Sequence, residues 1–395
     1  MNTTLAQHQA KSLTDDERTM QKLSLNHRRN KEQDHTRLMD ETSAAFVYAD
    51  CKDEYWNPES QSLFYGTPIW EQASPSQKVL LNQLYWVAYY AQIISAEIAT
   101  ILLNQTSAAG LYTMEDFRLV CDTLDLESSQ ERAHIAAFKK VSEAVEAEVF
   151  GERLFTYPMR SMYEQTMVFP DANSITNFWR GIQLRAFTML STGNAFIGCQ
   201  YFTVRGIRTL NGKMIQHPLS RFYLAHPKGE DAPIPSKISH YHFMDESFHF
   251  NSSGLISHDV LRSLKEPTKF ESMIANKALY GCQKDHFHFS VAINGIFWHD
   301  PALYATTFKM LTSRAFGLER GQALELMRRC FTEETAGLHA SRKTHATAVD
   351  SYKAYLADIG YVDARNKEMR LMAGSDIPGY LARNRAAFRR FAPAA

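Results

Sequence analysis

The chain has 395 residues, of which 45% are hydrophobic and 22% are charged, as in an ordinary globular protein. Its 43 basic side chains equal its 43 acidic ones, so no net field attracts a polyanion, and we expect neither a nucleic-acid nor a membrane partner. The 5 cysteines are widely separated and form no CxxC pair, which argues against a disulfide framework or a four-cysteine zinc site. We therefore expect a protein of the reducing cytoplasm.

The N-terminal region is polar and charged over residues 1–42, and its sequence predicts a peripheral extension that buries little. We expect a single helical domain over residues 43–395, with its core at about 77–265 and additional helices over 266–395. Aromatic residues and prolines in the segment 43–76 predict an irregular wrap that leads to a helix start.

Helical patterns dominate the rest of the chain, so the predicted fold class is all-α. The predicted helices, in chain order, cover about 77–105, 114–150 with a break near 122–129, 172–210, 235–265, 267–278, 300–315, 319–358 and 376–390. The third ends at Asn211-Gly212, a turn signal, and a loop follows over 213–234. The alternating segment 286–295 fits a short strand or a loop.

The most apolar stretch, residues 80–103, is interrupted by Asn82, Gln83, Gln92 and Glu97, and we interpret it as a buried helix rather than a membrane span. A single carboxylate on such a helix needs a partner. For Glu97 the sequence leaves two alternatives, a metal ion or a salt bridge to an arginine on a neighbouring helix.

Two further motifs place carboxylates and imidazoles on one helix face. Glu131 and His134 are three residues apart, a spacing that lets both side chains reach one metal ion but that also arises by chance. His242, Glu246 and His249 fall within a narrow arc at about 100° per residue. Aromatic neighbours favour burial of this second set, and the alternative is an exposed polar face.

In combination, Glu97, the Glu131-x-x-His134 pair and the His242-x3-Glu246-x-x-His249 set follow the chain order of ferritin-like di-iron sites. The pattern resembles the p-aminobenzoate N-oxygenase-like di-iron proteins, in which a histidine precedes the last Glu-x-x-His. The resemblance covers about residues 77–265. It implies a ferritin-like helical bundle with extra N- and C-terminal helices.

The resemblance also implies an activity and a set of partners. These six side chains would bind two iron ions, or manganese as an alternative, and O2 would be the co-substrate in oxygenation of a small molecule. No flavin or nicotinamide motif is present, so repeated turnover requires an external electron donor. Relatives of this kind are often homodimers.

One departure from the family pattern concerns the third predicted helix, which contains neither Asp nor Glu. The bridging glutamate of the family, counted about three turns back from the predicted helix end, falls near Gln200, which we expect beside the metals. Glu164 is an alternative outside that helix. A missing carboxylate opens a coordination position for water, substrate or a halide, so the related dimetal-carboxylate halogenases are one alternative. A non-catalytic metal-binding protein is another.

Other histidines receive no catalytic role. His286 and His288 would share one face of a strand, but nothing else accompanies them, so we favour a structural role or a role in supporting the metal ligands. His339 and His345 are six residues apart on a segment that the sequence predicts as a solvated helix.

Overall fold

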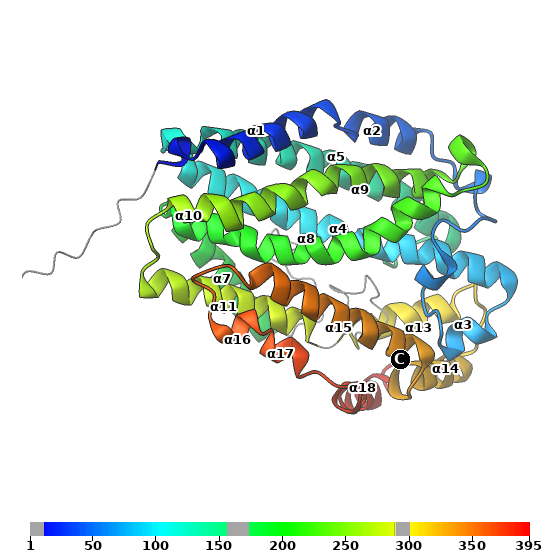
Figure 1. Cartoon of the computed structure of the whole chain (residues 1–395). Helices are drawn as coiled ribbons and strands as arrows, with labels where there is room; N and C mark the ends of the chain where they lie inside the picture. Colours follow the sequence, from blue (N-terminus) through cyan, green and yellow to red (C-terminus); the bar gives the residue numbers. More distant parts are fainter. Residues whose placement is uncertain (1–11, 156–173, 288, 290–300) are drawn as a thin grey trace, which may run out of the picture.

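A computed structural model describes residues 12–155, 174–287, 289 and 301–395. Within these ranges every regular element is a helix (Figure 1). The predicted all-α class is therefore confirmed. Glu164, His288 and most of the segment 286–295 lie outside the described residues.

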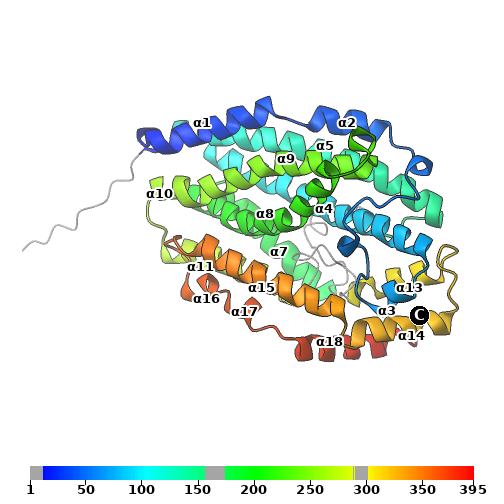
Figure 2. The ribbon, with the colours of Figure 1, turned by 45° about the vertical axis from the view of Figure 1, so that its right-hand side comes forward.

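Four long helices form the central bundle: α4 (Pro75–Leu111), α5 (Arg118–Phe150), α8 (Ala195–Leu224) and α9 (Ile234–Gly254). Helix α4 packs along α5, α8 packs along α9, and the two pairs meet through contacts of α4 with α8 and of α5 with α9. The four helices therefore enclose a common interior, which is consistent with a ferritin-like fold. Figures 1 and 2 show them lying side by side from both directions.

The ends of these helices follow from local sequence. Ser74 and Gln77 form a reciprocal capping box at the start of α4, and Pro75 occupies the first helical position. Asn194 caps α8 by accepting a hydrogen bond from the Ile197 amide. Helix α5 ends at Phe150, and the next residue, Gly151, has a φ of 71°, a left-handed conformation that favours glycine.

The predicted boundary at Asn211-Gly212 is wrong. The chain breaks earlier, between α7 (Ser174–Ser191) and α8, and α8 continues through Pro218 to Leu224. The apolar residues Ile215 and Leu219 are 7% and 1% exposed, so packing in the bundle outweighs the turn propensity of the Asn-Gly pair. The predicted loop over 213–234 is therefore mostly helix.

The predicted break near residues 122–129 is also absent, and α5 is one continuous helix. Within the predicted break, the Ser128 hydroxyl donates to the Leu124 carbonyl one turn back, and the helix is not interrupted. The helix predicted over 235–265 is confirmed: α9 continues beyond Gly254 through a π-helical turn, Leu255–Val260, into the short α10 (Leu261–Ser263). The bundle thus contains longer continuous helices than local signals suggest.

The N-terminal region lies at the periphery of the bundle, but it is helical and buries more than its polar sequence predicts. It forms α1 (Glu17–Glu32) and α2 (Thr36–Ala44), which lie along α5 and α9 at the top of Figure 1. Leu23 and Met39 are 2% and 0% exposed, respectively. The polar composition misled the prediction, because a few apolar residues at helical spacing are sufficient to cover the bundle.

The remaining helices form a second layer on the opposite side of the bundle (Figure 2). Those that contact α8, or one another beside it, are α7, α11 (Lys269–His286), α15 (Ala336–Leu356), α16 (Ala364–Lys367) and α17 (Arg370–Ala373). The others gather near one end and are α3 (Pro68–Gln72), α13 (Tyr304–Thr312), α14 (Arg320–Thr332) and α18 (Ile377–Phe391). The single helix predicted over 319–358 is therefore two helices, α14 and α15.

Helix α4 is long and apolar enough, by length and composition alone, to cross a membrane. Core helices of soluble proteins pass the same test. Here α4 packs against α5 and α8, as expected for a buried helix.

His345 lies in the second layer and is fully buried, so the prediction of a solvated helix is wrong at this position. Its Nε2 lies 2.9 Å from the Met372 carbonyl oxygen and 3.0 Å from the Ser375 hydroxyl. Burial lowers the pKa of His345 to about 4, and the Arg342 charge contributes. The folded state therefore holds this imidazole neutral.

This pKa predicts a loss of stability in mild acid. Because the unfolded chain takes up the proton near pH 6.5, the contribution of His345 is present above that pH and is lost as the pH falls toward 4. Between pH 7 and pH 5, the free energy of unfolding measured with urea should fall by about 2 kcal/mol more in wild type than in His345→Gln. His339→Gln, at an exposed position on the same helix, should behave as wild type. Equal pH dependence in wild type and His345→Gln would contradict the assignment.

Candidate metal centre

Six of the seven residues singled out in the sequence come together inside the bundle. Helix α4 supplies one, α5 two and α9 three: Glu97, Glu131, His134, His242, Glu246 and His249. Their potential ligand atoms form two groups, each within 4.8 Å: Glu97, His134, His242 and Glu246 in the first, and Glu131, Glu246 and His249 in the second. Each group could hold one metal ion, and Glu246 belongs to both.

The first group is centred on the carboxylate of Glu97. His242 Nε2 lies 3.1 Å from Glu97 Oε1 and 3.6 Å from Glu246 Oε1. His134 Nδ1 lies 3.7 Å from Glu97 Oε1. The exposed fraction of Glu97 is 4%, and both imidazoles are fully buried, so water has little access to these charges.

The second group is built around His249. Its Nδ1 lies 3.1 Å from Glu246 Oε1 and 3.3 Å from Glu131 Oε1. The other oxygen of Glu131 lies 3.4 Å from His134 Nδ1 and so faces the first group. Glu131 and Glu246 therefore both connect the two groups, as bridging carboxylates do in sites with two metals.

Several buried polar atoms in these groups lack a hydrogen bond among the described residues. They include Glu97 Oε2, Glu131 Oε2 and His134 Nδ1. A buried polar atom without a partner is costly. Coordination of a cation would satisfy all three, and a donor set of carboxylate oxygens and imidazole nitrogens suits iron or manganese. The residues present therefore fit a metal centre.

Proton sharing compensates these charges in the metal-free chain. Burial opposes the charged form of His249, but the Glu246 and Glu131 carboxylates raise its pKa well above the usual value. Burial raises the pKa of Glu97, and repulsion from Glu131 adds to this. A metal ion would displace the imidazole protons, so metal binding should release protons.

The outward nitrogens of two imidazoles have their own partners. His134 Nε2 lies 3.1 Å from Asp245 Oδ2, and His249 Nε2 lies 3.0 Å from Gln130 Oε1. When Nε2 carries the proton and donates it to such a partner, Nδ1 faces the carboxylates with a lone pair that can bind a metal. Sequence reasoning missed both partners. The position of Asp245, directly before Glu246, was a signal that could have found it.

Gln200 does not lie with these residues. Near the start of α8, the Gly198 carbonyl accepts a hydrogen bond from Ser107, which lies ten residues beyond Glu97 on α4. At a rise of 1.5 Å per residue this level is roughly 15 Å from Glu97. Gln200 is 1% exposed, and its amide atoms have no hydrogen-bond partner in the described structure. The expectation that it lies beside the metals is therefore not supported.

The actual α8 position at the level of Glu97 follows from two contacts with α4. Arg205 donates to Asn104 Oδ1 at 3.3 Å. About three turns further along α8, Gln216 lies beside the Tyr89 hydroxyl. On α4, Glu97 is close to midway between Tyr89 and Asn104. The α8 residues that face Glu97 are thus midway between positions 205 and 216.

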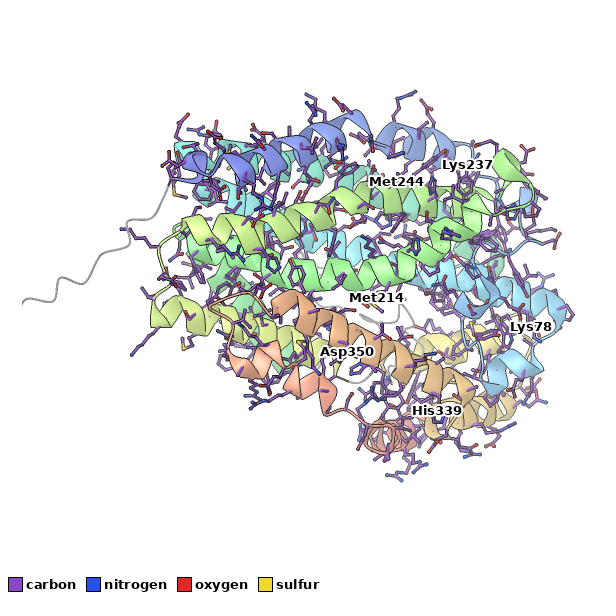
Figure 3. All side chains as sticks on the ribbon, in the orientation of Figure 1. Lys78, Met214, Lys237, Met244, His339 and Asp350 are labelled. Atoms are coloured by element: carbon purple, nitrogen blue, oxygen red, sulfur yellow. The ribbon has the colours of Figure 1, made fainter. Side chains whose placement is uncertain are left out.

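Two α8 residues near this level share a helix face with positions 205 and 216: Thr209, whose hydroxyl donates to the Arg205 carbonyl, and Gly212, which has no side chain. Counting three turns back from the real helix end, Leu224, also reaches residues 212–213. A methyl group added at Gly212 would meet only Gln216 Nε2, at 3.7 Å, so space is open there. Figure 3 labels Met214 on α8 and Met244 on α9, each two residues from Gly212 and Glu246, respectively.

The alternative of a salt bridge between Glu97 and an arginine is not observed within the described residues. The buried arginine nearby, Arg205, instead pairs with Glu127 on α5, with an N–O distance of 2.6 Å. Both side chains are almost fully buried, so their charges cancel locally. The carboxylates of the cluster therefore remain available to a metal.

The fold and this cluster define the class of the protein: a ferritin-like helical bundle whose interior carries carboxylates and imidazoles suited to metal. A family model described as "Acyl halogenase CylC-like" matches residues 18–392, and the chain belongs to this CylC-like acyl halogenase family. No curated protein and no solved structure matches it. The family favours the halogenase alternative over the N-oxygenase interpretation.

The shared position of Glu246 predicts a metal stoichiometry. Wild type loaded anaerobically with ferrous iron should hold about two ions per chain. In Glu131→Ala the second group loses a ligand while the first keeps all four of its own, so about one ion should remain, whereas Glu246→Ala removes a ligand from both and should abolish tight binding. Elemental analysis after desalting measures this.

The matched control is Glu143→Ala, at a partly exposed position on the same helix as Glu131, which should retain the wild-type iron content. Full iron content in Glu246→Ala would contradict the shared ligand.

Proposed function

We propose that this protein is an O2-dependent dimetal halogenase that replaces a C–H bond of an acyl chain by a carbon–halogen bond. The observation that carries the proposal is the absence of a carboxylate from α8 where that helix faces the cluster. Helix α8 contains neither Asp nor Glu over its whole length. Together with the family match, this supports halide binding at the open position.

Charge balance favours an anion at this position. Two divalent ions carry four positive charges, and Glu97, Glu131 and Glu246 supply only three negative ones. Asp245 does not make up the difference at the metals, since its oxygens are already bonded to His134 and His35. A halide beside Gly212 would neutralise the remaining charge in an interior of low dielectric constant.

The surroundings of Glu97 suit an apolar substrate. Ile93, Ile98 and Ile101 on α4 are only half-buried, although the helix is deeply buried before this stretch. An apolar chain that covered them would gain about 25 cal/mol per Å² of apolar surface removed from water. This supports an aliphatic acyl chain that approaches the metals along α4.

The reaction balances with one external reductant. Exchange of hydrogen for a halide ion at carbon removes two electrons from the substrate, and reduction of O2 to two waters takes four. A one-electron donor must therefore deliver two electrons, together with three protons. Bound iron would supply the O2 chemistry, and no other cofactor motif is present in the sequence.

The protein's own residues would hold and shield this chemistry. Glu97 and His242 would hold one metal ion, and the buried rings of Tyr90 and Phe138 pack against His242, with ring centroids 5.6 and 4.9 Å from its own. Asp245 and Gln130 orient the other two imidazoles. Exclusion of water strengthens the interaction with an anion and limits side reactions.

The decisive variant is Gly212→Glu, which would place the missing carboxylate at the open position. We expect it to retain iron, because it adds a ligand, and to lose halide binding, because the new carboxylate occupies the position and neutralises the charge. Bromide titration of cobalt-loaded protein, followed by its visible absorption, measures halide binding without knowledge of the substrate.

The control is Gly281→Glu on α11, where an added side chain also meets open space. It should respond to bromide as wild type does. If cobalt-loaded wild type does not respond to bromide, or if Gly212→Glu responds as strongly as wild type, the proposed halide position is wrong.

A further inference from the structure

The N-terminal helices reach toward both metal groups through buried hydrogen bonds. Near the end of α1, Asn30 Oδ1 accepts a hydrogen bond from Gln130 Nε2 at 2.8 Å. Gln130 Oε1 in turn lies 3.0 Å from His249 Nε2. Asn30 and Gln130 are 0% and 1% exposed, so water cannot replace either partner. This first connection ends at the imidazole of the second group.

A second connection begins where α2 starts. His35 donates its backbone N–H to Asp245 Oδ1 at 3.1 Å, and its ring Nδ1 lies 2.9 Å from the same oxygen. Asp245 Oδ2 then lies 3.1 Å from His134 Nε2. Asp245 is fully buried, and its two oxygens are thus held from opposite sides. This connection ends at the imidazole of the first group.

The two connections lie close together in the N-terminal region but end at different groups. Asn30 and His35 are separated by a single turn of chain between α1 and α2. Helices α1 and α2 pack against both α5 and α9, which carry His134 and His249. Figures 1 and 2 show these helices lying along the bundle from both directions. A movement of the chain between Asn30 and His35 would therefore change the hydrogen bonds that orient both imidazoles.

From this arrangement we infer that the α1–α2 segment orients both imidazole ligands, with Asn30 and His35 as positioning residues for different metal groups. The inference rests on the proposed metal centre. Asn30 fixes the amide of Gln130 so that its oxygen faces His249, and His35 fixes the rotation of Asp245 so that it faces His134. Each imidazole is thus held with Nδ1 toward the carboxylates.

The same helix offers a matched comparison. Asn26 is also buried on α1 and donates to Ser252 Oγ at 2.9 Å and to the Phe248 carbonyl at 3.3 Å. It therefore anchors α1 to α9 through similar bonds, but these bonds do not lead to an imidazole ligand. If the α1–α2 segment were purely structural, loss of Asn26 and loss of Asn30 would have the same effect on metal binding, whereas a positioning role predicts an effect of Asn30 alone.

The test is cobalt titration of the full-length chain, which measures each binding step without turnover. Loss of a partner of this kind weakens metal binding by about 10- to 100-fold. Asn30→Ala should weaken one of two steps by about 10-fold, and His35→Ala should weaken the other by less, since its backbone N–H is retained. The double variant should weaken both, and Asn26→Ala neither. Thermal unfolding of the metal-free variants reports stability separately.

The outcomes separate the inference from the proposed metal centre. If wild type binds fewer than about two ions, the two-metal centre fails. If wild type binds them and Asn30→Ala behaves as Asn26→Ala does, the centre stands and the positioning role is overturned. If Asn30→Ala does not fold, His35→Ala decides, because that side chain is partly exposed and its loss is milder. Unchanged binding in His35→Ala would then overturn the inference.

Discussion

The structure depends on compensation of charge in a place that water does not reach. Glu97, Glu131 and Glu246 share the interior of the bundle with three imidazoles, and all are largely or fully buried. Without partners such charges would unfold a domain of ordinary stability. In the metal-free chain protons on the imidazoles provide the compensation, and the proposed metals would do so in the active form. The fold thus requires either protons or metal in this place.

This constraint extends beyond the six residues. An imidazole can serve as a ligand only if its other nitrogen is satisfied, which explains the buried Asp245 and Gln130. These in turn need partners, and α1 and α2 provide them. Elsewhere in the bundle, Arg205 is neutralised by Glu127. Burial of one polar group therefore obliges the chain to bury the next, until the series reaches the partly exposed His35.

The sequence was informative where the candidate ligands of one set lie on a single helix. The spacing of Glu131 and His134, and of His242, Glu246 and His249, places each set on one face whatever the rest of the chain does. These sets face one another because the helices form a bundle. The resemblance to ferritin-like di-iron proteins predicted that bundle from the order of the motifs. Their role as ligands remains a prediction.

The sequence was misleading where the answer depends on contacts between distant helices. The α8 position facing the cluster was assigned to Gln200 because Asn211-Gly212 was interpreted as a helix end, and the extension of α8 to Leu224 moved the level to Gly212. The prediction that the N-terminal region buries little was wrong for a similar reason. Its role depends on partners on α5 and α9 that no local pattern reveals.

The glycine at position 212 has a consequence for the history of such proteins. Its backbone angles are those of an ordinary helix and its surroundings are open, so other side chains can be accepted without rearrangement of the scaffold. A change in a single codon could then replace a glutamate ligand at this position by a glycine and the proposed halide, or reverse that replacement. Divergence between reaction types in such bundles would need no new fold and no intermediate of low stability, only one tolerated substitution.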